Sequence, residues 1–298
     1  MMRDWVEAVR FKFLPQGVLP VLLGTAVAWN DERLVNLGYF ALAFLGMMLV
    51  QFGLTMLKDL VDYLQGTDRT KSMYKNPYSG GSGVLADGRI KPKKMLGVIV
   101  AFYLSAFFIG LYFALNVGIE VLYIALAGFF ISIVYTVVRF KLAYRRLGEL
   151  AMLLGYGPII TLGAYFVQAE VLSTRAFLAG LVPGMLMWAM ILVNEIPDYK
   201  EDSRAGKRNL TVQFGVKRSS GLYTLSLAAI YAFIGFGVIF EVFPPWVLIA
   251  LLSLPFAMRS VGYLQRYYDD RIRVAAANAE MAKTYSATVL LFTLGFLL

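Results

Sequence analysis

The feature that most constrains this chain is its series of long apolar stretches. A helix needs about 20 mostly apolar residues to cross a bilayer, because the hydrocarbon core is about 30 Å thick. Nine stretches meet this description, at 14–30, 38–57, 95–115, 119–138, 147–167, 176–196, 221–240, 245–262 and 279–298. Only 16% of the residues are charged, against about a quarter in soluble domains. The sequence therefore predicts an all-α, polytopic membrane protein with nine transmembrane helices.

The basic residues lie almost entirely on one side of these predicted spans. That side carries the N-terminus and the segments near 58–94, 139–146, 197–220 and 259–283. It holds 26 of the 28 Lys and Arg, together with 14 of the 19 acidic residues, whereas the opposite side has only Arg33 and Arg175 with five acids. Cytoplasmic loops carry the Lys/Arg excess, so the N-terminus is predicted inside and the C-terminus outside. The eighth stretch is short and contains Pro255, but the charge distribution requires it.

The chain has neither His nor Cys. This excludes disulfides, zinc sites built on those residues and Ser-His-Asp or Cys-His catalysis. Chemistry must then depend on carboxylates, amines, hydroxyls or hard metal ions. The long polar loops lie on the predicted cytoplasmic side, and functional residues concentrate on such loops. We therefore expect an active site that faces the cytoplasm, with the bilayer as a partner and no nucleic acid. The N-terminal stretch has no cleavage site, which favours a prokaryotic plasma membrane.

Two acidic segments with matching patterns follow the second and sixth stretches. The segments are KDLVDY at 58–63 and NEIPDY at 194–199. In each, a polar residue and an acid precede two apolar residues, an Asp and a Tyr. Both predicted spans run from outside to inside, so the segments occupy equivalent positions in an internal repeat. Repeat interfaces often form binding sites in membrane proteins.

Helical spacing places the acids of each segment on one face. Asn194, Asp198 and Asp202 recur every fourth residue, and Asp59 and Asp62 are three apart. Like charges at a helix C-terminus are unfavourable unless a cation binds there. Carboxylate oxygens suit Mg²⁺, which often shares its coordination shell with substrate phosphates. Gly66 matches the position of Asp202, so Asp68 is the candidate third acid of the first cluster.

Basic residues surround both acidic clusters, as a diphosphate ligand would require. They are Arg69, Lys71, Lys75, Lys141, Arg145, Arg146, Lys207 and Arg208. Two alternatives stay open: solvated helix ends whose acids balance nearby cations, and an ion-coupled transporter. The middles of the spans are almost free of charge, which favours an anionic headgroup over an ion path. The run at 79–83, SGGSG, resembles a phosphate-binding loop in composition only.

Four ordered blocks resemble one family over nearly the whole chain. They are WVEAVRFKFLPQGVLPVLLGTAVAW at 5–29, KDLVDYLQGTD at 58–68, YRRLGELAMLLGYGPIITLGAYFVQ at 144–168 and NEIPDYKEDSRAGKRNLTVQFG at 194–215. These blocks resemble the UbiA superfamily of intramembrane prenyltransferases, and within it the MenA-type 1,4-dihydroxy-2-naphthoate prenyltransferases of menaquinone biosynthesis. The resemblance implies one transmembrane domain over 1–298, a nine-helix bundle around a central cavity, with cytoplasmic cap loops at 58–94 and 197–220.

The resemblance also implies Mg²⁺-dependent transfer of an isoprenyl group from its diphosphate to an aromatic acceptor. The metal would be held, through the diphosphate, by Asp59, Asp62, Asp68, Asn194, Asp198 and Asp202. The diphosphate would contact Lys58, Arg69, Lys141, Arg145, Lys207 and Arg208. Candidates for acceptor binding or for cation–π stabilisation of the allylic carbocation are Arg10, Lys12, Tyr135, Tyr144 and Tyr165. Lys58 stands where the family usually has Asn, so direct phosphate contact is an alternative to metal binding. Other acceptors remain open: 4-hydroxybenzoate, a glyceryl phosphate lipid or a porphyrin.

Overall fold

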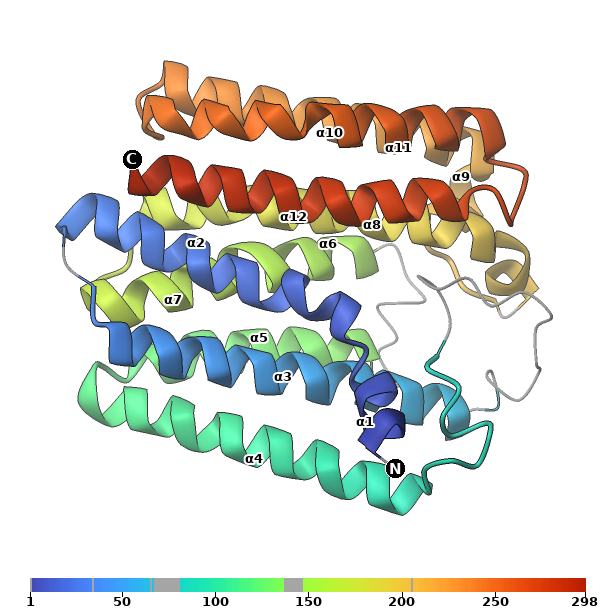
Figure 1. The fold of residues 1–298 in the computed structure, drawn as a ribbon, viewed down its shortest axis with the longest axis horizontal. Helices are drawn as coiled ribbons and strands as arrows, with labels where there is room; N and C mark the ends of the chain where they lie inside the picture. Colours follow the sequence, from blue (N-terminus) through green and yellow to red (C-terminus); the bar gives the residue numbers. More distant parts are fainter. Residues whose placement is uncertain (1, 34, 65, 67–80, 137–146, 205) are drawn as a thin grey trace.

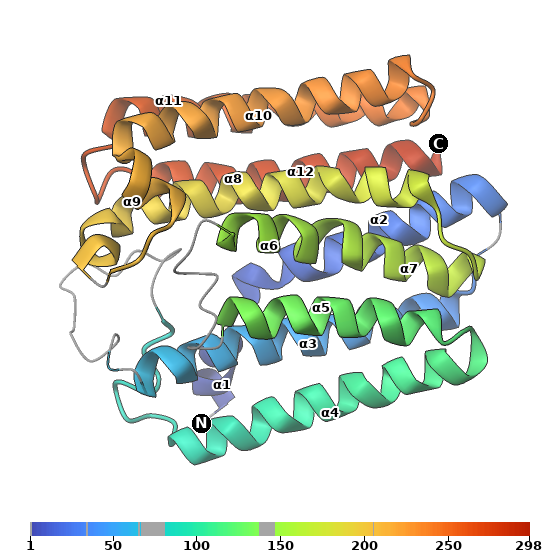
Figure 2. The ribbon, with the colours of Figure 1, turned by 180° about the vertical axis from the view of Figure 1, so that it is seen from behind.

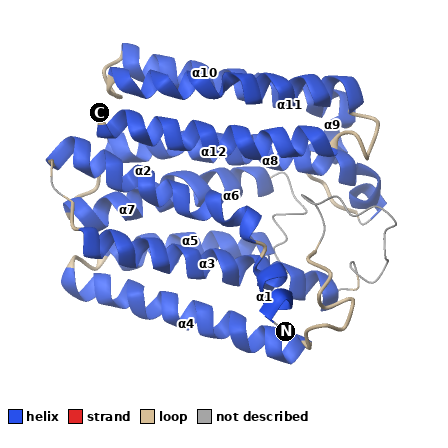
Figure 3. Ribbon diagram, in the orientation of Figure 1, coloured by secondary structure: helices blue, strands red, loops and turns tan. Residues whose placement is uncertain are grey.

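The protein is a bundle of long helices in the described part of the chain. A computed structural model describes residues 2–33, 35–64, 66, 81–136, 147–204 and 206–298, without the side chains of 133–136. All regular structure in these ranges is helical, and none of it is strand (Figure 3). The predicted all-α class is therefore confirmed for this part of the molecule.

The helices run roughly along one axis and are stacked in layers (Figures 1 and 2). They are α1 (Met2–Val9), η1 (Phe11–Phe13), α2 (Leu14–Glu32), α3 (Leu37–Leu64), α4 (Pro92–Asn116), α5 (Glu120–Thr136), α6 (Gly148–Leu154), the π-helical turn η3 (Gly155–Ile159), α7 (Ile160–Ala169), α8 (Thr174–Arg204), α9 (Leu210–Phe214), α10 (Val216–Ile239), the 3₁₀ segment η4 (Pro245–Ser253), α11 (Leu254–Tyr267) and α12 (Ala275–Leu297). From one side of the bundle to the other, α4 is followed by α3 and α5, then by α2 with α6 and α7, then by α8 with α12, and finally by α10 and α11.

Helical structure coincides with each of the nine predicted stretches. Seven helical segments of the described chain are long and apolar enough to cross a membrane. The other two are α5, whose apolar part Glu120–Ser132 is shorter, and α12. A multi-pass membrane protein is thus confirmed, whereas the count of nine crossings stays a prediction.

The eighth stretch is longer than the sequence indicated. The helical segment Pro245–Tyr267 has 23 residues, because the 3₁₀ segment η4 leads directly into α11. Pro255 lies in the first turn of α11. Proline is tolerated there because the first N–H groups of a helix have no intrahelical partner. Pro255 therefore starts a helix instead of interrupting one.

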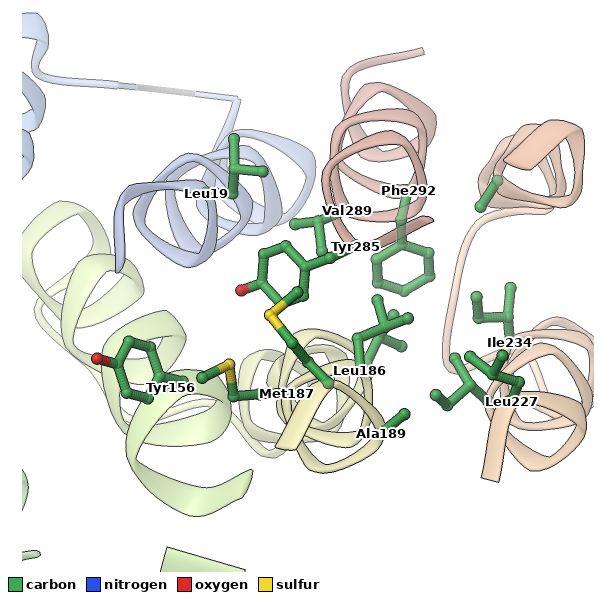
Figure 4. Packing of buried hydrophobic residues seen from close by; sticks show 14 of the residues in the cluster. Leu19, Tyr156, Leu186, Met187, Ala189, Leu227, Ile234, Tyr285, Val289 and Phe292 are labelled. Carbon is green, nitrogen blue, oxygen red and sulfur yellow. The ribbon is translucent and has the colours of Figure 1, made fainter. Parts of the chain in front are cut away.

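The largest hydrophobic core lies where α2, α8, α10 and α12 meet. Tyr285 and Phe292 of α12 are fully buried, as are Leu186 of α8 and Ile234 of α10. Figure 4 shows Tyr285 reaching from α12 toward the space between α2 and α8, while Phe292 points toward α10. These contacts fix α8, and hence the acidic residues at its C-terminal end, relative to the N-terminal helix α2.

Glycines allow the end of α6 and the following η3 to approach α8 closely. A Cβ atom on Gly157 would lie 2.4 Å from the carbonyl oxygen of Gly180, and one on Gly184 would lie 2.5 Å from that of Leu153. Gly180 and Gly184 are four residues apart and share a face of α8. Small residues at this spacing let membrane helices pack at short distance. The contact holds Tyr156 of η3 against the bundle interior.

This packing makes a prediction about stability. Replacing Gly184 with Ala should lower the free energy of unfolding by about 1–3 kcal/mol, since the added methyl group overlaps backbone that cannot move aside. Gly110→Ala in α4 is the matched control, because a Cβ there meets nothing within 4 Å. Thermal unfolding in detergent would measure both. Equal unfolding midpoints for the two variants would contradict the close approach of the end of α6 to α8.

The two ends of the bundle differ. The N-terminus, α1, α9 and the C-terminal ends of α3 and α8 lie at one end, and the C-terminus lies at the other (Figures 1 and 2). The first end carries both acidic segments found in the sequence. We call it the acidic end.

Candidate active site

Asp59 in the last two turns of α3 is held by two partners. Its side chain is almost completely buried, at 2% exposure. Oδ1 lies 3.5 Å from Nη1 of Arg10, and Oδ2 accepts a hydrogen bond from the backbone N–H of Ser82 at 2.8 Å. Arg10, which sits between α1 and η1, has the left-handed backbone conformation (φ 51°). The chain therefore turns sharply here and brings the guanidinium group over the first acidic cluster.

The segment that carries Ser82 is anchored by apolar and charged contacts. Val84, Leu85 and Ile90 are buried in a cluster with residues of α1, α3 and α4. Arg89 binds Glu7 of α1, with Nη1 2.6 Å from Oε2, and Asp4 at 3.2 Å. The hydrogen bond to Glu7 is the largest cause of a raised pKa of Arg89. This part of the expected cap loop is thus fixed to the bundle beside Asp59.

Asp202 near the C-terminal end of α8 is the centre of the second cluster. It is buried, and its Oδ1 lies 2.6 Å from Nζ of Lys207. Its Oδ2 accepts a hydrogen bond from Nδ2 of Asn209 at 2.9 Å. Asn209 also caps α9, because its Oδ1 accepts from the N–H of Val212 at 2.8 Å. The loop after α8 therefore folds back and places Lys207 against the carboxylate of Asp202.

The other two members of the second cluster are also in polar contacts. Asn194 accepts a hydrogen bond from Asn278 of α12 through Oδ1. Asp198 lies 4.0 Å from Arg271, which also binds Glu201. Arg271 comes from the connection between α11 and α12. Helix α12 and the connection before it thus contribute to the cluster on α8.

The two clusters meet around Lys207. Asp62 of α3 is close enough to interact electrostatically with Lys207, with Lys58 of its own helix and with Arg10. Lys207 thus interacts with both Asp62 and Asp202, which are 140 residues apart in the sequence. Lys58 is exposed at the same end. The structure therefore brings together the two segments that the sequence repeat predicted to be equivalent.

A buried acid that the sequence did not single out supports this arrangement. Glu149 in the first turn of α6 is 1% exposed, and its Oε1 accepts a hydrogen bond from the N–H of Leu210 at 2.8 Å. Leu210 is the first residue of α9, directly after Asn209. Glu195 of α8 interacts with Glu149 and with Thr211 of α9. These carboxyl groups tie the loop that carries Lys207 to α6 and α8.

The donor set of the two clusters fits a cation that is held mainly by substrate. Among the residues that the structure describes, no three acidic side chains are close enough to form a metal cage. Mg²⁺ bound to a phosphorylated substrate takes only one or two carboxylates from the protein and fills its shell with phosphate oxygens and water. Asp62 on one helix and Asp198 or Asp202 on another provide such oxygens. The neighbouring Lys and Arg side chains supply the donors that phosphate also needs.

The structure does not place every predicted residue at this site. Tyr165 is buried near the opposite end of the bundle, where it interacts with Asp31 and Ser173. Its assignment to the acidic end is therefore wrong, because α7 runs away from that end. Arg10 is paired with Asp59, and Lys12 lies beside Phe13 and Arg10. Arg208 is exposed next to Lys207. The side chain of Tyr135 lies outside the described part of the chain. The same is true of the predicted residues Asp68, Arg69, Lys71, Lys75, Lys141, Tyr144, Arg145 and Arg146.

The comparison with protein families decides what kind of protein carries these clusters. The model of the UbiA prenyltransferase family matches residues 17–286. The chain belongs to this family. As a prenyltransferase, it falls in the enzyme class that the resemblance of the four sequence blocks implied, and the transporter alternative loses its support. The family match spans both acidic clusters and the helices that join them.

Three curated relatives show which members of the UbiA family this chain resembles. The 1,4-dihydroxy-2-naphthoate octaprenyltransferase of Bacillus subtilis is 26% identical over 91% of this chain and 86% of its own length. The enzyme of that name from Escherichia coli is 25% identical over 99% and 95%. The 2-carboxy-1,4-naphthoquinone phytyltransferase of Synechocystis is 23% identical over 91% and 85%.

Solved structures share the fold at low identity. A UbiA homologue from Archaeoglobus fulgidus, bound to DMAPP and Mg²⁺, superposes with a TM-score of 0.67 at 14% identity, covering 96% of this chain and 99% of its own. A digeranylgeranylglyceryl phosphate synthase gives a TM-score of 0.66 at 15% identity over 99% and 98%. Both confirm the UbiA-type arrangement of helices.

Several residues at the acidic end were not predicted from the sequence. Ser82, Asn209 and Arg271 all contact acids of the two clusters. Ser82 belongs to the Gly-rich run at 79–83, which was a weak signal by composition alone. Arg271 lies far along the chain, between α11 and α12, and no sequence pattern relates it to Asp198. Its position depends on the packing of α12 against α8.

Proposed function

We propose that this enzyme transfers an isoprenyl group from an isoprenyl diphosphate to 1,4-dihydroxy-2-naphthoate, in a Mg²⁺-dependent step of menaquinone biosynthesis. The observation that carries the proposal is the meeting of Asp62 and Asp202 around Lys207, from helices in the two halves of the chain. A lysine that interacts with acids of both helices suits an anionic substrate that arrives with a divalent cation. The names of the Bacillus and Escherichia relatives support this acceptor.

In the proposed reaction, the side chains of the acidic end bind and orient the diphosphate. Asp59, Asp62, Asn194, Asp198 and Asp202 would hold the metal, together with Asp68. Mg²⁺, when bound, would neutralise the diphosphate and so make it a better leaving group. Lys207 and Arg10 would donate hydrogen bonds to its oxygens, together with Lys58 and Arg208 nearby and the predicted Arg69, Lys141 and Arg145.

The remaining chemistry takes place against the apolar interior of the bundle. The allylic C–O bond breaks, a C–C bond forms to the acceptor ring, and the ring proton passes to the released diphosphate or to a carboxylate. The interior would receive the isoprenyl tail and exclude water from the allylic cation. Tyr135 and Tyr144 stay candidates for stabilising that cation through their ring faces.

We further propose that the acidic end faces the cytoplasm of a cell whose plasma membrane the chain crosses nine times. The N-terminus lies at this end and the C-terminus at the opposite end (Figure 1), as an odd number of crossings requires. The excess of Lys and Arg among the loop segments of the acidic end supports this orientation.

A product screen by mass spectrometry tests the proposed function. Purified enzyme with Mg²⁺ would be offered several isoprenyl diphosphates, each with dihydroxynaphthoate, 4-hydroxybenzoate, a porphyrin or a glyceryl phosphate lipid. We expect a prenylated product from dihydroxynaphthoate and none after chelation of the metal. A product from another acceptor alone would overturn the acceptor, and no product from any pair would overturn the reaction.

A further inference from the structure

Two glutamine side chains are buried in the interior of the bundle with incomplete hydrogen bonding. Gln16 of α2 is 3% exposed and Gln51 of α3 is 2% exposed. The Oε1 atom of each finds no donor within the described part of the chain. A buried polar atom without a partner costs free energy, and most such atoms in folded proteins are satisfied. Polar side chains inside a membrane bundle are functional candidates for this reason.

The two amides contact neighbouring helices around adjacent residues of α2, Gln16 and Gly17, and we call this region the junction. Gln51 Oε1 is 3.0 Å from the position that a Cβ on Gly17 would occupy, so the amide of α3 rests directly on the backbone of α2. Nε2 of Gln16 contacts Sδ of Met190 in α8 at 3.5 Å. The hydroxyl group of Tyr285 in α12 donates to the backbone carbonyl of Gln16 at 3.1 Å.

Tyr156 of η3 adds a hydroxyl group to this junction. Its side chain is 9% exposed and interacts with Gln51. Tyr156 and Tyr285 are on opposite sides of Met187 in Figure 4, with α2 lying above them. Met187 and Met190 have unbranched side chains that change rotamer at low cost. The junction therefore combines hydrogen-bonding groups, aromatic rings and side chains that can move to admit a ligand.

The register of two helices connects this junction with the acidic clusters. Gln51, Thr55 and Asp59 recur every fourth residue, so they follow one face of α3. Met190, Asn194, Asp198 and Asp202 do the same on α8. At 1.5 Å per residue, Gln51 lies about 12 Å along the helix from Asp59, and Met190 lies about 6 Å from Asn194. A molecule at the junction would thus lie inward of a diphosphate bound at the acidic end.

We propose that Gln16, Gln51 and Tyr156 form the binding site for the acceptor, and that this site selects an aromatic ring bearing two hydroxyl groups. Both atoms without partners are acceptors, so the ligand must bring donors. Two ring hydroxyls satisfy both oxygens, whereas a ligand with a single hydroxyl, whether a phenol or a glyceryl phosphate lipid, leaves one amide unsatisfied. The inference rests on the proposed function, whose diphosphate site supplies the reacting carbon next to this ring.

The test uses Gln16→Leu and Gln51→Leu, which keep side-chain size but remove the amide. Calorimetry in the absence of diphosphate would measure the binding of dihydroxynaphthoate. The transfer reaction would give the KM of each substrate. We expect the Kd and KM of the acceptor to rise about five- to tenfold in each variant, because each variant loses one hydrogen bond to the acceptor. The KM of the diphosphate should stay unchanged. Thr161→Val is the matched control, because Thr161 of α7 is a fully buried residue whose hydroxyl has no partner among the described residues.

A ligand with one hydroxyl methylated makes the test specific. It should bind the wild type about five- to tenfold more weakly than dihydroxynaphthoate, and this difference should disappear in one of the two Leu variants. An unchanged acceptor KM, or equal rises for acceptor and diphosphate, would overturn the site. If a Leu variant fails to fold, binding to the wild type still tests the site. Equal affinity of the wild type for dihydroxynaphthoate and for its methylated form would overturn the site as well.

These results separate the site from the proposed function. If the wild type binds dihydroxynaphthoate, the Leu variants bind it weakly, and no isoprenyl diphosphate gives a product, the site stands and the reaction fails. If product forms and the Leu variants keep the acceptor KM of the wild type, the reaction stands and the site fails.

Discussion

Replacing Asp62 or Asp198 with asparagine should lower the rate of isoprenyl transfer by about a hundred- to a thousandfold. Asparagine keeps the shape of the side chain but removes the negative charge that a metal-bound diphosphate requires. The two residues lie on different helices, α3 and α8, so equal losses would indicate that both clusters act on one substrate. Initial rates at saturating acceptor and Mg²⁺ would measure the effect.

Asp269→Asn is the matched control for these two variants. Asp269 is an exposed acid in the connection between α11 and α12, outside both clusters. Its replacement should leave the rate unchanged. Wild-type activity in Asp62→Asn or Asp198→Asn, with an unchanged unfolding midpoint, would rule out the proposed metal assignment for that residue.

Lys207→Gln should lower kcat/KM for the isoprenyl diphosphate by about ten- to a hundredfold, the effect of losing one charge-assisted hydrogen bond. In the free enzyme Lys207 is 2.6 Å from Asp202 and close to Asp62. With the diphosphate and its cation bound, Asp62 and Asp202 would face the cation, and the amine of Lys207 would be free to donate hydrogen bonds to the phosphate oxygens. The loss should therefore appear mainly in KM for the diphosphate, with KM for the acceptor unchanged.

Lys200→Gln provides the control for this variant. Lys200 lies on α8 between Asp198 and Asp202, but it is exposed on a different face of the helix. Both variants remove one positive charge from the same end of the molecule. If the two lowered kcat/KM equally, the effect would come from the overall electrostatic potential and not from a contact of Lys207 with the diphosphate.

Local features of the sequence predicted much of the architecture. The apolar stretches gave the positions of the helices, since the length and composition of a membrane helix are set by the bilayer around it. The matching segments at 58–63 and 194–199 predicted that the ends of α3 and α8 would be equivalent. The repeat itself stays a prediction, but both helices end at the acidic end, and Lys207 interacts with an acid of each.

Predictions about single side chains inside the bundle were less successful. Tyr165 was assigned to the acidic end, whereas α7 carries it toward Asp31 at the opposite end. Gln16, Gln51 and Glu149 drew no attention in the sequence, because a lone polar residue within an apolar stretch has no periodic pattern. Their burial and their partners follow from which helices pack together, and that information is distributed over the whole chain.

The sequence by itself determined that the chain is a multi-helix membrane protein with two acidic helix ends among basic residues. These properties depend on the local balance of apolar and charged residues against the thickness of a bilayer. Only the tertiary structure decided which cations pair with which acids, and that the amides of Gln16 and Gln51 are buried in the interior. Contacts such as that of Arg10 with Asp59 or of Glu149 with Leu210 join residues many turns apart, and their formation depends on the packing of helices against one another.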